Sequence, residues 1–313
     1  LVPEHLDKER FLTVYNGIVQ ERLQGKHSGD KVKANGLKIA INGAFGKLNF
    51  PYFWLYDPLA FYRVTLYGQL LLLDLIEKLY LAGINCVSAN TDGIVCHFPK
   101  EKEDTYFTVC QEWIERTGMN LEYTDYEKLV QLNVNSYMSI TTDGKVKTKK
   151  DFEDNKALDK QTFVKGYNAP VIALALQAYF KDGIAPEEFI RSHENIHNFF
   201  YTQRAGAKFT LYIVTGSKWD ELQKTNRYYV STGGGSLVKK DKTTQKQMGA
   251  IKGQFKTNRI NRILKGEFVN VLNNIPEQLE DNIKYDFYIQ KAKEIIEKIE
   301  PKQETAMMKS IFA

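Results

Sequence analysis

Asp92 is the residue whose type and setting could do metal chemistry. It lies in the segment Ala89–Gly93, between two short runs rich in apolar and β-branched residues, 84–88 and 94–98. Runs of this kind are typical of strands, so the segment is predicted as the tight turn of a β-hairpin. A carboxylate at such a tip is held rigidly and still exposed, which suits a ligand of a divalent cation. The simpler alternative is an ordinary polar turn, because Thr-Asp-Gly favours turns.

A second pattern lies upstream, in Lys38–Gly46. On a helix, Lys38, Asn42 and Phe45 stand at positions i, i+4 and i+7, so they share one face. A lysine on that face can donate to phosphate as a compact point charge. The alternative is an amphipathic helix whose lysine only reaches into solvent.

The elements that must position these residues follow from hydrophobic spacing and from Gly-rich breaks. Helices are expected at 5–26, 32–44, 59–81 and 101–118. The first two are joined by a short polar tip and predict a helical hairpin. Strands are expected at 129–140 and 146–152, joined by a turn at Asp143-Gly144. From Asn168 onward the chain is expected to be mainly helical.

Composition sets the broad class of protein. The chain has 313 residues, of which 43% are hydrophobic and 12% aromatic, and a net charge of only +5, so we expect a folded globular protein. Cys86, Cys96 and Cys110 lack metal-ligand spacing, which predicts neither disulfides nor a zinc site, and a reducing, cytoplasmic compartment. The longest apolar run, 70–73, is followed by charged residues, so neither a membrane span nor a signal peptide is expected.

The two patterns, in this order and at this spacing, resemble motifs B and C of the family B DNA polymerases, usually written K-x3-N-S-x-Y-G and D-T-D-S. The resemblance implies that Asp92 is a catalytic metal ligand for Mg²⁺ in a two-metal site. It also implies that Lys38, Asn42 and Phe45 bind the incoming dNTP, with Phe45 at the position of the family's tyrosine.

The chain departs from motif C at two positions. Asn90 stands at the first aspartate and Gly93 at the serine. Further upstream, Arg22 and Lys26 match an Arg-x3-Lys pair that clamps the triphosphate in the family, and Arg suits bidentate phosphate contact. An exposed charge pair is the alternative for these two residues.

The resemblance also implies contacts with primer-template DNA. The segment Val134–Tyr137 stands where the family has K-K-R-Y, so Asn135 and Tyr137 are expected to contact DNA although the basic residues are missing. A run of basic residues follows the glycines Gly233–Gly235, and its alternative is a solvated surface. The residues expected to hold duplex phosphates are Lys239, Lys240, Lys252, Lys256, Arg259 and Arg262.

Two histidines and two further segments lie downstream of these motifs. His193 and His197 are four residues apart, as metal ligands on a helix can be, but without a third ligand they are interpreted as surface or packing residues. The segments Arg227–Ser231 and Tyr285–Ile289 resemble thumb segments of bacteriophage-type family B enzymes.

The sequence is therefore interpreted as an α+β protein with helical-hairpin fingers at 1–46, an antiparallel-sheet palm at 47–162 and a mainly helical thumb at 163–313. It is expected to be the C-terminal portion of a DNA-directed DNA polymerase, which transfers nucleotides to a primer 3′ end by a two-metal mechanism. Its expected partners are primer-template DNA, dNTPs and an upstream segment that carries motif A and the other aspartate, just past which the chain is expected to begin. Alone it is expected to be inactive. The alternatives are a degenerate polymerase-like DNA-binding module and an unrelated α+β interaction protein.

Overall fold

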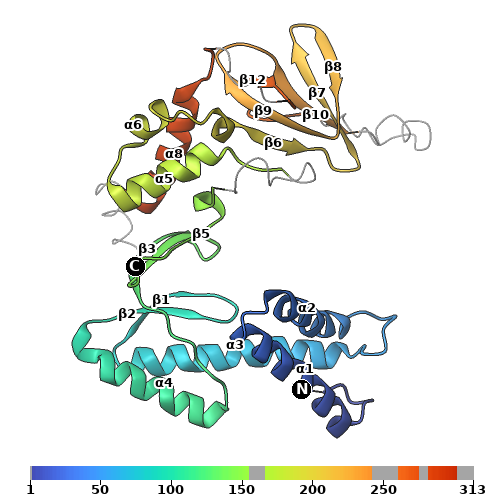
Figure 1. The fold of residues 1–313 in the computed structure, drawn as a ribbon, viewed down its shortest axis with the longest axis vertical. Helices are drawn as coiled ribbons and strands as arrows, with labels where there is room; N and C mark the ends of the chain where they lie inside the picture. The colour runs from blue at the N-terminus through green and yellow to red at the C-terminus, as the bar shows by residue number, and fades with distance from the viewer. Residues whose placement is uncertain (1, 155–165, 242–259, 275–280, 302–313) are drawn as a thin grey trace, which may run out of the picture. The chain divides into compact units, whose positions relative to one another are not determined.

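The computed structural model describes residues 2–154, 166–241, 260–274 and 281–301, which contain both helices and antiparallel sheets (Figure 1). The expected α+β class is confirmed. The chain divides into two compact units, Leu1–Tyr123 and Thr124–Ala313. This division falls within the segment predicted as the palm, and the fingers, palm and thumb boundaries stay predictions.

The N-terminal unit begins with the predicted helical hairpin, formed by α1 (Lys8–His27) and α2 (Lys31–Lys47). Each helix starts at an aspartate N-cap: Asp7 accepts from the Arg10 N–H and Asp30 from the Lys33 N–H. The two helices approach each other closely at Gly25, which is buried. A Cβ at this position would lie only 3.4 Å from the Ala34 nitrogen, so the absence of a side chain suits the contact.

The rest of this unit is a long helix, a β-hairpin and a shorter helix: α3 (Pro58–Leu81), β1 (Asn85–Ala89), β2 (Ile94–His97) and α4 (Glu103–Thr117), the last preceded by the short helix η1 (Lys100–Lys102). Asp57 caps α3 and Pro58 fits its first turn. The two helices and the hairpin enclose a small core, whose buried members are Leu75, Leu79, Ile84, Cys110 and Trp113. The hairpin is thus fixed on a packed base.

Helix α3 bears on the expectation that the chain has no membrane span. By length and composition it is the one helix among the described residues that could cross a membrane, although only 11% of its apolar 18-residue stretch is buried. The charged residues Asp74, Glu77 and Lys78 do not exclude a membrane span, because they lie toward the end of the helix and an apolar stretch of this length fits largely before them. Such a helix is weak evidence for a membrane span, since soluble proteins also contain them.

Among its described residues, the C-terminal unit has three antiparallel sheets, ordered β3-β4-β5, β11-β10-β7-β8 and β12-β9-β6. The strands are β3 (Tyr126–Asn133), β4 (Ser136–Thr141), β5 (Val146–Lys149), β6 (Tyr201–Arg204), β7 (Phe209–Thr215), β8 (Lys218–Leu222), β9 (Thr225–Ser231), β10 (Ser236–Asp241), β11 (Ile260–Arg262) and β12 (Phe268–Val271). The helices are η2 (Lys150–Phe152), α5 (Pro170–Asp182), α6 (Pro186–Arg191), η4 (Ile196–Phe199) and α8 (Tyr285–Ile299).

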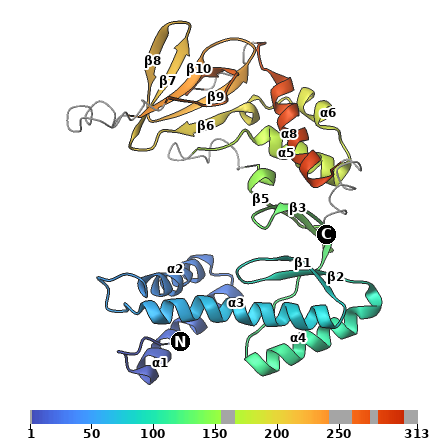
Figure 2. The same ribbon diagram turned by 180° about the vertical axis from the view of Figure 1, so that it is seen from behind.

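The prediction of a mainly helical segment after Asn168 is wrong, because β6 to β12 all lie there (Figure 2). The composition of β7 and β9 is β-branched and aromatic, and Gly216-Ser217 makes a two-residue turn that pairs Thr215 with Lys218. The single strand expected at 129–140 is also wrong. It is two strands, β3 and β4, separated by a turn at Val134-Asn135.

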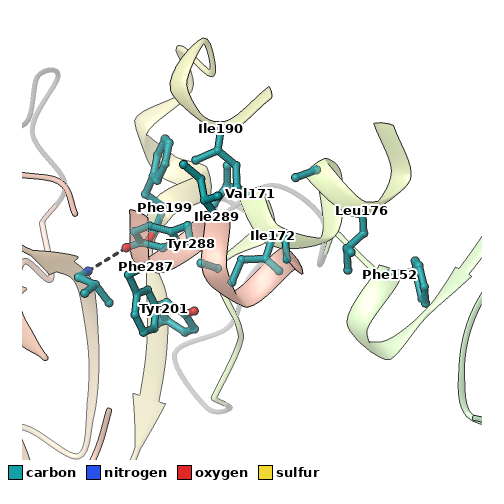
Figure 3. Close-up of a cluster of buried hydrophobic side chains, with 14 of the residues drawn as sticks. Phe152, Val171, Ile172, Leu176, Ile190, Phe199, Tyr201, Phe287, Tyr288 and Ile289 are labelled. Atoms are coloured by element: carbon teal, nitrogen blue, oxygen red, sulfur yellow. Dashed lines mark hydrogen bonds between the residues drawn. The ribbon is translucent and has the colours of Figure 1, made fainter. Parts of the chain in front are cut away.

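The core of the C-terminal unit gathers around Tyr288 of α8, which has no exposed surface (Figure 3). Its hydroxyl accepts from the Val230 N–H of β9 at 2.8 Å and donates to the Phe199 carbonyl at 2.9 Å. The two segments that resemble thumb segments, 227–231 and 285–289, are therefore in contact. Burial raises the pKa of the Tyr288 hydroxyl well above its ordinary value, so it stays a donor.

Candidate functional site

Asp92 lies at the tip of the β1–β2 hairpin, as predicted, and its side chain is exposed. The strand register pairs Ala89 with Ile94, and the Asn90 N–H donates to the Gly93 carbonyl at 2.9 Å. Asn90 Oδ1 also accepts from the Asp92 N–H at 3.1 Å. Thr91 and Asp92 are therefore the two residues of a tight turn, and the Asn90 side chain supports it.

The two strands of this hairpin carry cysteines at directly opposite positions. Cys86 of β1 and Cys96 of β2 are opposite one another, and all three cysteines are free. Burial, with smaller contributions from Cys86 and Cys110, raises the pKa of the Cys96 thiol to about 12. This environment keeps the thiol neutral at physiological pH, so it acts as a packing residue of the hairpin.

The motif B residues lie on one helix, as predicted. Lys38 and Asn42 are exposed on α2, while Phe45, one turn further on, is half-buried. None of the ion pairs between described residues involves Lys38. A free ammonium group on an exposed helix face can meet an anionic ligand without first breaking a contact.

Phe45 is less available than the sequence pattern suggested. Its ring stacks on Phe61 of α3, with ring centroids 4.7 Å apart and planes 21° apart. Both rings pack against a second small core formed by Leu48, Leu55 and Ala60. Phe45 therefore anchors α2 to α3, and only part of its ring remains for a nucleotide.

Arg22 and Lys26 both lie on α1, as predicted, in different surroundings. Arg22 is half-buried, whereas Lys26 is exposed and its Nζ lies 3.5 Å from Glu122 Oε1. The Glu122 side chain is 91% exposed, so this ion pair contributes little and a phosphate can displace it.

Two residues expected to contact DNA, Asn135 and Tyr137, lie at the β3–β4 turn and in β4. Asn135 is exposed in the β3–β4 turn, where its N–H donates to Asn133 Oδ1 at 3.0 Å, and Tyr137 is half-buried in β4. The sequence-based interpretation missed Lys149 as a partner. Its Nζ lies 5.6 Å from the centre of the Tyr137 ring, because the Asp143-Gly144 turn sets Lys149 of β5 opposite Tyr137.

The basic residues expected to hold duplex phosphates do not share one face. Lys252, Lys256 and Arg259 lie outside the described residues. Successive strand residues point to opposite faces, so Lys239 and Lys240 of β10 are on different faces of their sheet. Lys239 Nζ lies 4.2 Å from the centre of the Phe209 ring, and Lys240 Nζ lies 6.0 Å from that of Trp219.

Arg262 shares a face with one of these lysines. It lies directly opposite Val238, which is two residues from Lys240 on the same strand. Paired residues and residues two apart point the same way, so Lys240 and Arg262 lie on one face and Lys239 on the other. A duplex on one face can therefore use Lys240 and Arg262 together.

His193 and His197 are packing and surface residues, as interpreted from the sequence. They do not share a helix, because α6 ends at Arg191 and His197 belongs to η4. A ring nitrogen of His193 lies 2.7 Å from Asn198 Nδ2, and the ring stacks on Phe189. Burial lowers the pKa of His193, so it is neutral at pH 7.

The residues present do not by themselves make a metal site. Across 2–154, 166–241, 260–274 and 281–301, no group of three or more His, Cys, Asp or Glu side chains could hold a common ion. Asp92 supplies one hard oxygen ligand, whereas a two-metal site needs bridging carboxylates from more than one position.

Comparison of the chain with known protein families gives no match, and comparison with curated proteins gives none either.

Proposed function

We propose that the chain is the fingers, palm and thumb portion of a bacteriophage-type family B DNA-directed DNA polymerase. One relationship carries the proposal: the exposed Asp92 turn and the helix with the free Lys38 belong to the same compact unit. In both views of that unit the loop end of the β1–β2 hairpin is turned toward α2, on the same side of α3 (Figures 1 and 2).

The residues of α2 have separate tasks in this proposal. Lys38 places a point charge against the triphosphate of an incoming dNTP, and Asn42 offers an amide one turn further along the same face. Phe45 holds the helix on α3 and presents the rest of its ring to the nascent base pair. Arg22 and Lys26 add charge from α1, once phosphate has displaced Glu122 from Lys26.

Mg²⁺ would be the cofactor of the complete enzyme, and Asp92 would be one of its ligands. In the family that the chain resembles, the other carboxylate belongs to motif A, so we place it on an upstream segment that carries this motif. We therefore propose that this chain binds primer-template DNA and dNTPs but does not extend primers without that segment.

The thumb of this proposal is built largely from strands, with Lys240 and Arg262 on the face that would follow the duplex. Tyr137 with Lys149 offers a second contact, and this lysine stands in for the basic residues missing before the tyrosine. The proposed compartment is the cytoplasm, of the host if a bacteriophage encodes the protein.

A degenerate polymerase-like module that only binds DNA is the second candidate. Asn90 favours it, because an amide replaces a carboxylate beside Asp92 and lowers the local negative charge. The two candidates differ in one outcome, which is whether nucleotides are joined to a primer.

Primer extension decides between them. The chain is tested alone and joined to the polypeptide encoded directly upstream, with Mg²⁺ and all four dNTPs. We expect extension only from the joined protein, and its loss in Asp92→Asn with duplex binding unchanged. Asp143→Asn is the matched control, because Asp143 is also an exposed hairpin-turn aspartate, paired with Lys145. Extension by the isolated chain, or by joined Asp92→Asn, would contradict the proposal.

A further inference from the structure

The segment between α2 and α3 displays four aromatic side chains to solvent. Their exposed fractions are 42% for Phe50, 90% for Tyr52, 64% for Trp54 and 40% for Tyr56. We call the segment 48–57, which carries these four rings, the aromatic loop. Four large exposed rings within residues 50–56 are unusual on a protein surface and indicate a binding site.

The exposure does not come from a loosely held segment. Inward and outward residues alternate: Leu55 is 5% exposed and Phe53 packs against the same small core, while the rings on either side point outward. The Asp57 N–H donates to the Leu48 carbonyl at 2.9 Å, which closes the loop. His5 Nε2 lies 2.8 Å from the Trp54 carbonyl. The backbone is thus fixed, and the rings are presented at little cost in entropy on binding.

A lysine lies directly beside the aromatic loop. Helix α2, which ends at Lys47 just before the loop, contains four lysines and no acidic residue, and its first two lysines lie at the opposite end of the helix. Its last residue, Lys47, places Nζ 4.6 Å from the centre of the Phe50 ring and 4.9 Å from that of Phe53. None of the ion pairs between described residues involves Lys47, so the rings lie next to a lysine that is free to meet a ligand with flat rings and negative charge.

We propose that the aromatic loop binds single-stranded nucleic acid by stacking its bases on Tyr52 and Trp54, with Lys47 opposite the phosphates. Bases within a duplex are already stacked on each other, so the surface selects unpaired strands. A partner with a purely apolar surface would leave Lys47 without an opposite charge. This inference goes beyond the proposed function, because it assigns base binding to residues outside the two polymerase-like motifs.

Fluorescence anisotropy with labelled oligo(dT) tests the inference on the full chain. We expect Trp54→Ala and Tyr52→Ala each to weaken binding roughly 5- to 150-fold, as loss of one stacked base does. Tyr80→Ala is the matched control, since Tyr80 of α3 is 69% exposed and lies outside the loop. It should change affinity less than twofold.

An abasic oligonucleotide of the same length separates stacking from charge. Wild type should bind it more weakly than Trp54→Ala binds oligo(dT), because that variant keeps the stack on Tyr52, and on the abasic strand wild type and Trp54→Ala should bind about equally. Tyr52→Ala serves as a second variant if Trp54→Ala unfolds, because the Tyr52 side chain is almost fully exposed.

Three results would overturn the inference: equal affinity of wild type and both variants for oligo(dT), equal loss of single-strand and duplex binding, or wild-type affinity for the abasic strand equal to that for oligo(dT). The last two would indicate a structural role or a purely electrostatic surface, and the first a docking surface for another class of partner. None of these measurements uses primer extension, so failure of the polymerase proposal would leave them unchanged.

Discussion

Asn90 and Asp92 are joined by a hydrogen bond within the hairpin turn, from the Asp92 N–H to Asn90 Oδ1 at 3.1 Å. The acceptor is a side-chain oxygen, which a carboxylate also has. An aspartate at position 90, as in the motif that the turn resembles, would therefore keep the geometry of the turn and alter only its charge. A side chain at position 93 would also fit the turn, because a Cβ there would lie at an ordinary contact distance of 3.6 Å from Asn90 Oδ1.

Asn90→Asp should leave the free energy of unfolding nearly unchanged, whereas Asn90→Ala should lower it by about 0.5–1.5 kcal/mol, because only alanine removes the acceptor. Denaturant unfolding of the two variants beside wild type measures this. Equal stability of all three would mean that the Asn90 side chain does not support the turn.

Lys38→Ala should weaken dNTP binding, because it removes a free charge from the outer face of α2. In an extending protein the KM for dNTP should rise, and kcat should fall as well if the contact tightens in the transition state. Lys33→Ala is the control: it removes a lysine from the same helix, but one whose Nζ lies 3.3 Å from Glu21 on α1. Steady-state incorporation kinetics that rank the two variants equally would contradict the motif B assignment.

Lys240→Ala and Arg262→Ala should each reduce the salt dependence of duplex binding, whereas Lys239→Ala should not. Each neutralised phosphate contributes roughly −0.9 to the slope of log affinity against log salt, and only the first two side chains share a face. Anisotropy on primer-template DNA over a salt series measures the slope. Equal slopes for all three variants would show that the duplex does not lie on that face.

The sequence was most informative where local chemistry determines structure. Asp7, Asp30 and Asp57 cap their helices, and the turns at Thr91-Asp92 and Asp143-Gly144 form as their residue types predict. These features depend on a few neighbouring residues and can be identified without knowledge of the fold.

Long-range pairing could not be predicted in the same way. The sheet β12-β9-β6 joins segments far apart in the sequence, and Lys149 reaches Tyr137 only after the register of β4 and β5 is fixed. The aromatic loop could not be predicted either. Its residues are nearly all apolar or aromatic, so the sequence shows no alternation of polar and apolar side chains, and only the structure shows that Phe53 and Leu55 point inward while the rings beside them are exposed.

Gly234→Ala should lower the free energy of unfolding by about 2–4 kcal/mol. Its φ is +124°, and a Cβ would lie 2.7 Å from the Val269 carbonyl oxygen, so both strain and a backbone clash oppose the change. Gly233→Ala is the matched control, because nothing lies within 4 Å of its Cβ position. Denaturant unfolding should show a larger loss of stability for Gly234→Ala than for Gly233→Ala. Equal effects would show that the fold does not require the positive φ of Gly234.

The stability of the N-terminal unit should fall at alkaline pH. Burial raises the pKa of Cys96 from 9.0 to about 12, so the folded state holds this proton more tightly than the unfolded state. The stabilisation is complete below about pH 9 and is lost as the pH rises toward 12. Cys96→Ser should weaken this pH dependence without abolishing it, because burial also raises the pKa of Tyr106 and Cys110. Unfolding measured over a pH series would refute the assignment if the two proteins gave parallel curves.

The buried hydroxyl of Tyr288 has a consequence for the order in which the chain folds. Its two partners are 58 and 89 residues away in the sequence, whereas both small cores of the N-terminal unit are formed by residues within Leu1–Tyr123. Contacts at such separation form slowly and late. During translation the N-terminal unit can therefore complete its core first, while β9 keeps an unsatisfied N–H at Val230 until α8 has left the ribosome.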